Sequence, residues 1–101
     1  MRIIVIATEK RVALKLEGRL MGLWVEELRK TVVQTQRECQ PLEIDVSGLT
    51  YADEDGEKAL SWLYRKGAHF QGKGPFSKYL LDRLQIPFDF RETELDESSS
   101  R

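Results

Sequence analysis

Four carboxylates are crowded into one short stretch of the sequence, together with a glycine and a lysine. The residues are Asp53, Glu54, Asp55, Gly56, Glu57 and Lys58. Paired carboxylates can act as a general acid and a general base when crowding or burial moves their pKa values apart. The same side chains can instead form a negative surface that attracts a basic partner. This stretch is therefore the candidate functional surface of the chain.

The residues before the acids predict a strand. Leu42, Ile44 and Val46 alternate with polar side chains, which is the period of a strand with one apolar face. Ser47 and Gly48 follow, and both residue types favour turns, so the strand is expected to end there. The acids would then lie between this strand and the next element.

The residues after the acids predict a helix. Apolar side chains recur there at steps of three and four residues, which places them on one stripe of a helix: Ala59, Leu60, Leu63 and Tyr64. Arg65 and Lys66 would fall in the last turn, where cations complement the free carbonyl groups. Gly67 can adopt the left-handed conformation that closes a helix. The helix is thus bounded at both ends.

The acids are expected at the N-terminus of that helix. Free backbone N–H groups and a partial charge of roughly +0.5 favour anions there, by about 0.3–1 kcal/mol for each anion. One or two carboxylates satisfy that field, so the crowded acids should leave a net negative surface. The simpler alternative is that Asp53 or Asp55 only caps the helix, while the other acids are solvated.

The composition indicates a soluble globular protein. Of the 101 residues, 41% are hydrophobic and 33% are charged. We expect a single domain at 1–92 and a polar C-terminal tail at 93–101. The formal net charge of −1 argues against nucleic acid as a partner, because phosphate binding needs a basic face. The apolar run near the N-terminus is too short for a signal peptide or a membrane span, so we expect a cytoplasmic protein without membrane insertion.

Cys39 and His69 are the single cysteine and the single histidine of the chain. No internal disulfide can form, and no Cys/His metal site or Cys–His nucleophilic pair is expected. Gly72-Lys73-Gly74 matches neither the phosphate-binding nor the dinucleotide-binding pattern. We therefore expect no cofactor, no metal and no catalytic residue. An enzyme that uses the acidic stretch as acid or base is the alternative.

The hydrophobic pattern predicts alternating strands and helices. In chain order we expect a strand at 3–7, a strand from Val12 that ends at Gly18, a helix at 22–39, the strand and helix around the acids, a strand at 68–71, a helix from Pro75, and a strand at 88–91. The first two strands should form an antiparallel hairpin. Each later strand follows a helix, and such crossovers make strands parallel and place helices against the sheet. The expected fold is α/β, with a mixed sheet of four to five strands and about three helices packed mainly on one face.

Three stretches, in this order, resemble a STAS domain, the fold of bacterial anti-sigma-factor antagonists and of the cytoplasmic tails of sulfate transporters. VALKLEGRL, Val12 to Leu20, resembles the family's second strand and the loop after it. LEIDVSGLTYADEDGEKAL, at 42–60, resembles its apolar strand, its Gly-containing turn with an aromatic residue, and its Asp-Ser-Ser-Gly helix start. GKGPFSKYLLDRLQI, at 72–86, is a weaker match to a small-residue loop and a leucine-packing helix. The resemblance covers roughly Val12 to Phe90 and implies a STAS-like fold.

The resemblance implies a protein-interaction domain without enzymatic activity. In the antagonists, a kinase that is also the anti-sigma factor phosphorylates a serine of the Asp-Ser-Ser-Gly loop, and the phosphate releases the partner. Asp53 and Gly56 match this loop, whereas Glu54 and Asp55 stand at the two serine positions. Asp55 would carry a permanent charge of about −1 where a phosphoserine carries about −1.5 to −2. The phosphate switch is therefore not available at this loop.

We expect the chain to bind a protein partner through the acidic stretch, the loops at 18–23 and 73–76, and Trp62. Trp62 lies off the apolar stripe of its helix, as interface aromatics do, and its alternative role is packing at the edge of the core. The resemblance implies an anti-sigma factor or kinase as partner, or alternatively the other subunits of a membrane complex that transports lipids or anions. A homodimer, a bound nucleotide, and phosphorylation at Ser47, Thr50 or Ser61 are open alternatives.

Overall fold

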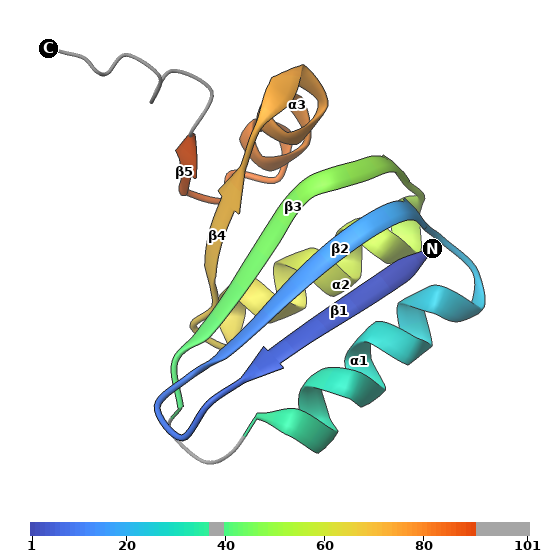
Figure 1. Ribbon diagram of the computed structural model, residues 1–101. Helices are drawn as coiled ribbons and strands as arrows, with labels where there is room; N and C mark the ends of the chain where they lie inside the picture. Colours follow the sequence, from blue (N-terminus) through green and yellow to red (C-terminus); the bar gives the residue numbers. More distant parts are fainter. Residues whose placement is uncertain (37–39, 91–101) are drawn as a thin grey trace, which may run out of the picture.

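The computed structural model describes residues 1–36 and 40–90, which form one five-stranded sheet and three helices (Figure 1). The strands are β1 (Arg2–Ala7), β2 (Val12–Leu20), β3 (Leu42–Ala52), β4 (His69–Gly72) and β5 (Phe88–Phe90). The helices are α1 (Leu23–Thr35), α2 (Glu54–Arg65) and α3 (Gly74–Arg83). The predicted helix end at Cys39 and the expected tail at 93–101 lie outside the described residues.

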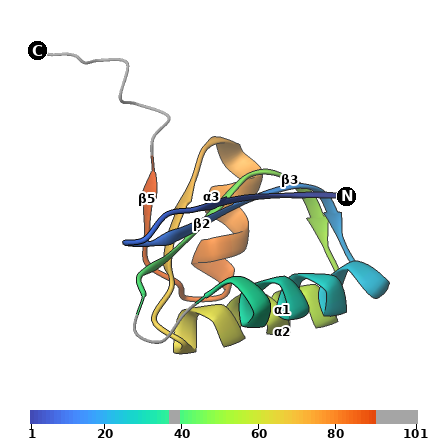
Figure 2. The same ribbon diagram turned by 60° about the horizontal axis from the view of Figure 1, so that its bottom comes forward.

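The sheet is mixed, and its strand order follows the sequence from β1 to β5. β1 and β2 pair antiparallel as a hairpin, and β2, β3, β4 and β5 pair parallel. Right-handed crossovers that advance in one direction across a sheet leave their helices on the same side. Figure 2 shows α1 and α2 together on one side of the sheet. The predicted mixed α/β sheet with its helices mainly on one face is confirmed.

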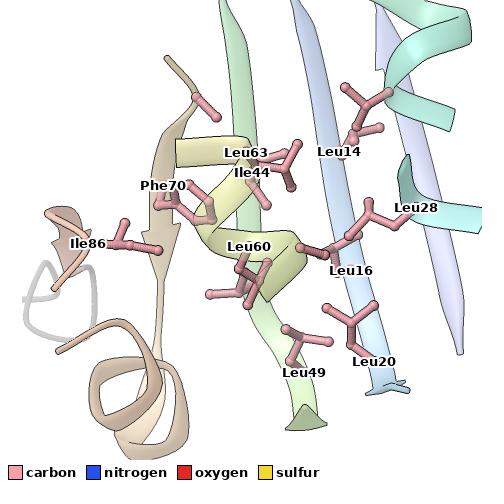
Figure 3. Close-up of a cluster of buried hydrophobic side chains, with 14 of the residues drawn as sticks. Leu14, Leu16, Leu20, Leu28, Ile44, Leu49, Leu60, Leu63, Phe70 and Ile86 are labelled. Carbon is pink, nitrogen blue, oxygen red and sulfur yellow. The ribbon is translucent and has the colours of Figure 1, made fainter. Parts of the chain in front are cut away.

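The hydrophobic core lies between the sheet and the helices. Figure 3 shows Leu16 of β2, Leu28 of α1 and Leu60 of α2 in this cluster, and all three are completely buried. Leu80 and Leu81 bring α3 into the same cluster. Burying one such side chain is worth about 1.5–3 kcal/mol. The sheet and the helices therefore stabilise one another.

β2 and β3 continue past the glycines at which we predicted their ends. β2 runs through Gly18 to Leu20, and β3 runs through Gly48 to Ala52. The pairing of the two strands shifts register twice in this stretch. Gly18 has a φ of +102°, and a Cβ added at Gly48 would lie 2.7 Å from Cγ of Glu17. The predicted ends were wrong because glycine inside a strand can mark a bulge or a close approach between backbones.

α1 is shorter than the helix predicted at 22–39. It ends at Thr35, and Gln36 already has an extended backbone, with φ −79° and ψ 123°. The side-chain nitrogen of Gln36 donates to the carbonyl of Gln40 at 2.9 Å. The carbonyl of Pro41 then accepts a hydrogen bond from the N–H of Val12 at 3.0 Å. These tertiary bonds lead the chain into β3 beside β2, so the helix ends well before the proline.

In the C-terminal half of the fold, the observed elements agree more closely with those predicted from the sequence. β4 is shifted by one residue from the predicted strand, and Phe70 is buried as expected. Pro75 lies in the first turn of α3, and Gln85, just after the helix, has a φ of +60°. Gly67 has a φ of +96°, the left-handed conformation expected after α2. Within the described ranges, none of the helices has the length and apolar character needed to cross a membrane.

Candidate functional site

The acidic stretch forms the beginning of α2, and Asp53 is its N-cap residue. Oδ1 of Asp53 accepts a hydrogen bond from the N–H of Gly56 at 2.7 Å, which satisfies one of the free donors of the first turn. The backbone carbonyl of Asp53 accepts from the N–H of Glu57 at 2.8 Å. We expected either Asp53 or Asp55 to cap the helix. Asp53 is the cap, so Asp55 does not have this role.

The beginning of α2 lies directly against the end of β2. The N–H of Asp53 donates to the carbonyl of Leu20 at 3.2 Å. Gly56 is buried, and a Cβ added to it would lie only 2.5 Å from the same carbonyl oxygen. A side chain at this position would therefore push the helix away from the strand. Gly56 allows the close approach that fixes where the acids project from the surface.

The acids of this stretch have different surroundings. The side chain of Glu57 is 15% exposed and forms an ion pair with Arg83 of α3. The side chain of Glu54 is 85% exposed, and its nearest cation is Nζ of Lys58 at 3.9 Å, one turn along the helix. Asp55 is exposed, and in the part of the chain that the structure describes it forms no hydrogen bond or ion pair. The accessible anionic surface is therefore formed by Glu54 and Asp55, rather than by all four acids.

An open groove of about 600 Å³ lies beside these acids, between the end of β3, the start of α2 and one side of α3. We call it the acidic groove; it is lined by Tyr51, Ala52, Asp53, Glu54, Glu57, Phe76, Tyr79 and Arg83. Tyr51 and Tyr79 are 42% and 59% exposed. The rings of Phe76 and Tyr79 are 6.4 Å apart. Tyrosine and arginine are residue types enriched at protein interfaces, and the groove contains exposed examples of both.

The two loops that we expected beside the acidic stretch do lie next to it. Leu20, in the predicted loop at 18–23, is the last residue of β2 and contacts the first turn of α2. Phe76, in the predicted loop at 73–76, is already helical and lines the acidic groove. Parallel strands β2, β3 and β4 end at the same edge of the sheet, so the residues that follow them gather there.

Trp62 lies elsewhere on α2. Its ring is partly buried between the guanidinium group of Arg29 on α1, 4.9 Å from the ring centroid, and Nζ of Lys66, 5.3 Å from it. Such cation–π contacts are worth about 0.5–1 kcal/mol at exposed sites. Trp62 is not among the residues that line the acidic groove. Its position fits packing at the edge of the core, and its contact with a partner stays a prediction.

Sequence reasoning missed Tyr51, Tyr79 and Arg83 as members of this surface. Tyr79 and Arg83 are four residues apart, so they lie on one face of α3, away from the stripe of buried leucines. This spacing could have identified a second face on the helix. The contact of that face with α2 depends on tertiary packing, because Glu57 and Arg83 are 26 residues apart in the chain.

The chemistry of the site is that of exposed charge next to aromatic rings. Glu54 and Asp55 face solvent, and Glu57 is held by Arg83. Across residues 1–36 and 40–90, no group of three or more His, Cys, Asp or Glu side chains could hold a metal ion. The acidic groove therefore presents aromatic rings and carboxylates on the same surface.

Two solved structures have the same fold as this chain. An uncharacterized protein of the DUF3478 family from Shewanella loihica, with a SpoIIAA-like fold, has a TM-score of 0.54 at 16% identity, over 94% of this chain and 88% of that one. A serine-to-glutamate variant of RsbS from Moorella thermoacetica has a TM-score of 0.53 at 18% identity, over 89% and 86%. No protein-family model and no curated protein matches the sequence. The chain therefore has a SpoIIAA-like fold, which confirms the STAS-like fold implied by the resemblance of its motifs.

Proposed function

We propose that the chain is a STAS-type regulatory domain that binds a protein partner through the acidic groove and the exposed acids beside it, without catalysis. The SpoIIAA-like fold and the motifs that resemble anti-sigma-factor antagonists support this class of function. The acidic groove supports the location, because it combines exposed aromatic rings with carboxylates, and the exposed Asp55 is next in sequence to its lining residue Glu54.

The observation that carries the proposal is the state of Asp55. Its side chain is exposed in the first turn of α2 and has no ion-pair partner among residues 1–36 and 40–90, so its charge is available to a partner. The resemblance of the motif places the phosphorylated serine of the antagonists at this position. A carboxylate carries its charge permanently, at about −1, whereas a phosphate adds or removes about −1.5 to −2. The domain would therefore keep one binding state instead of switching between two.

The surface predicts the chemistry of the partner. A complementary protein would place Lys or Arg side chains against Glu54 and Asp55, and an apolar or aromatic side chain between Tyr51 and Tyr79. A kinase-type anti-sigma factor is the first candidate, in a bacterial signalling pathway that regulates transcription in the cytoplasm. The ATPase or permease of a lipid or anion transport complex is the alternative.

The test is quantitative affinity capture from the native lysate with three baits: wild type, Asp55→Lys and Glu26→Lys. Glu26 is an exposed acid in the first turn of α1, so its reversal is matched to that of Asp55 in charge and in helix position. We expect the physiological partner to be captured by wild type and by Glu26→Lys, and about tenfold less by Asp55→Lys, which corresponds to about 1.4 kcal/mol.

The identity of the captured protein distinguishes the two roles. An ATPase domain of the anti-sigma type supports the regulator, and a transporter ATPase or permease supports the transport complex. Melting temperatures of the three baits must agree within a few degrees for the comparison to hold. Equal capture of every specific partner by wild type and by Asp55→Lys would reject the proposed binding surface, which includes the exposed Asp55 beside the acidic groove.

A further inference from the structure

The two edge strands of the sheet differ in how readily another chain could pair with them. β5 has only three residues, whereas β1 has six and reads RIIVIA. Val5 and Ile6 of β1 are 38% and 60% exposed. Edge strands usually carry Lys, Pro or a bulge that prevents them from pairing with another chain. Apart from Arg2 at its first position, β1 has no charged residue and no Pro, and it pairs with β2 without a register shift.

The hairpin determines which backbone groups of β1 are free. The N–H of Thr8 donates to the carbonyl of Arg11 at 2.9 Å, so this opposed pair is hydrogen-bonded. Antiparallel pairs alternate between hydrogen-bonded and non-hydrogen-bonded positions. Residues 2, 4 and 6 therefore bond to β2, while the N–H and C=O groups of Ile3, Val5 and Ala7 point away from it. These groups form the open edge.

The open edge is self-complementary in one register. Two copies of β1 can pair antiparallel about a two-fold axis, and an axis at Val5 places Ile3 of one copy opposite Ala7 of the other. All three outward residues of each strand then lie in hydrogen-bonded pairs. An axis at Ile4 or Ile6 would leave one of these residues without a partner inside the strand. The same register places Ile4 opposite Ile6 of the second copy, a favourable pair of β-branched side chains.

The charges at the two ends of the strand are compatible with this arrangement. Arg2 has a side chain that is 72% exposed; it pairs with Glu17 at 3.4 Å and would lie opposite Thr8 of the second copy, next to Glu9. Glu9 and Lys10 are both exposed in the turn after β1, and Arg11 is held by Glu43 at 2.9 Å. The backbone pairing, and not the charge, therefore selects the register.

We propose that β1 is a homodimer interface, in which the β1 strands of two copies pair antiparallel about a two-fold axis at Val5 and join the two sheets into one. β1 is the edge farthest from β4 and β5 in the strand order, and it lies on the far side of β2 from β3, whose end opens the acidic groove. The dimer would therefore present two acidic grooves, and its formation is independent of the partner proposed for them.

Sedimentation velocity over a dilution series tests the dimer directly. Wild type should sediment as a dimer that dissociates on dilution. Val5→Pro removes an N–H that points outward, so it should yield a monomer while the β1–β2 ladder stays intact. Ile6→Lys places a charge on a residue that is already 60% exposed, and it should raise the dissociation constant at least tenfold. Val33→Lys is the matched control, because Val33 is 67% exposed on α1, and it should leave the dimer unchanged.

Cysteine cross-linking tests the register. On a Cys39→Ser background, Val5→Cys would place two thiols in directly opposed residues about 5.5 Å apart at Cα, a separation that a disulfide spans. Mild oxidation should therefore cross-link this variant into a covalent dimer. Ala7→Cys is the control, because its two thiols would lie at opposite ends of the paired strands and should cross-link far more slowly.

Several results would overturn the proposal. Wild type that sediments as a monomer at every concentration rejects the dimer. A dimer that survives both Val5→Pro and Ile6→Lys lies on another surface, and equal cross-linking of the Val5→Cys and Ala7→Cys variants rejects the register. If Val5→Pro fails to fold, Ile6→Lys and the cysteine pair still decide the question. Loss of the dimer without any change in partner capture would leave the proposed function intact.

Discussion

The beginnings of α2 and α3 lie at the same edge of the sheet, but they are held in different ways. α2 is capped by its own sequence, because Asp53 accepts a hydrogen bond from the N–H of Gly56. At α3 the N-cap residue is Lys73, and its side chain forms no cap. Instead, the buried hydroxyl of Ser77 donates to the carbonyl of Val46 in β3 at 3.0 Å. The start of α2 therefore has a local side-chain cap in addition to its backbone bond to β2, whereas the start of α3 is held by a side-chain bond to the sheet.

This difference separates residues that stabilise the fold from residues that are free to bind. At α3 the stabilising groups are buried, so the exposed ring of Tyr79 remains as surface. At α2 a single residue, Asp53, completes the cap, and the adjacent Glu54 and Asp55 have no such role. Charged side chains that do not stabilise the fold are free to bind a partner. The comparison therefore explains why the proposed partner surface is centred on α2.

The largest effect is expected where α3 is packed against the sheet. A Cβ at Gly72 would lie 2.7 Å from Cβ of Ser77 and 3.4 Å from Cγ2 of Val46, and these atoms are held in the core. Gly72→Ala should lower the free energy of unfolding by about 2–3 kcal/mol, as overpacking does in a dense core. Urea denaturation measures this change. A loss below about 0.5 kcal/mol would show that close packing does not hold the start of α3.

In the second test, Gly56→Ala at the start of α2 has two opposite effects on the free energy of unfolding: a gain in helix propensity and a clash with β2. Helix propensity alone favours Gly56→Ala by about 1 kcal/mol. The added Cβ would lie 2.5 Å from the carbonyl oxygen of Leu20, which cannot move without disturbing β2. We expect the clash to prevail, with a net loss of about 1–2 kcal/mol in thermal or urea unfolding. A gain in stability would mean that α2 does not contact β2 this closely.

Removal of the local cap should have a moderate effect. Asp53→Ala leaves the N–H of Gly56 without its acceptor, so we expect a loss of about 1 kcal/mol in the free energy of unfolding. Asp53→Asn is the control, because asparagine caps helices about as well as aspartate, and it should retain most of the stability. If both variants are equally destabilised, the charge of Asp53 contributes more than its hydrogen bond.

The smallest effect on stability is expected at Asp55. Because this side chain is exposed and forms no bond among the described residues, Asp55→Asn should change the free energy of unfolding by less than about 0.5 kcal/mol. Partner capture should nevertheless fall, while Asp53→Asn should affect capture less. A clear loss of stability at Asp55 would contradict the separation between the capping acid and the binding acids.

The elements that the sequence predicted best are those with local signals. The closure of α2 at Gly67 and the start of α3 near Pro75 follow from backbone preferences of single residues. The predicted strand ends at Gly18 and Gly48 failed, because each glycine meets a residue of another segment. Whether a glycine ends a strand or lets two backbones approach depends on contacts that no local pattern contains.

The sequence by itself determined the chemical character of the candidate site. It placed acids at a helix N-terminus and supplied Asp53 as a cap. Only the tertiary structure decided which acids are accessible, because α3 brings Arg83 to Glu57 and leaves Glu54 and Asp55 in solvent. Residue type and spacing determine charge and local backbone geometry, whereas exposure depends on packing between segments that are distant in the chain.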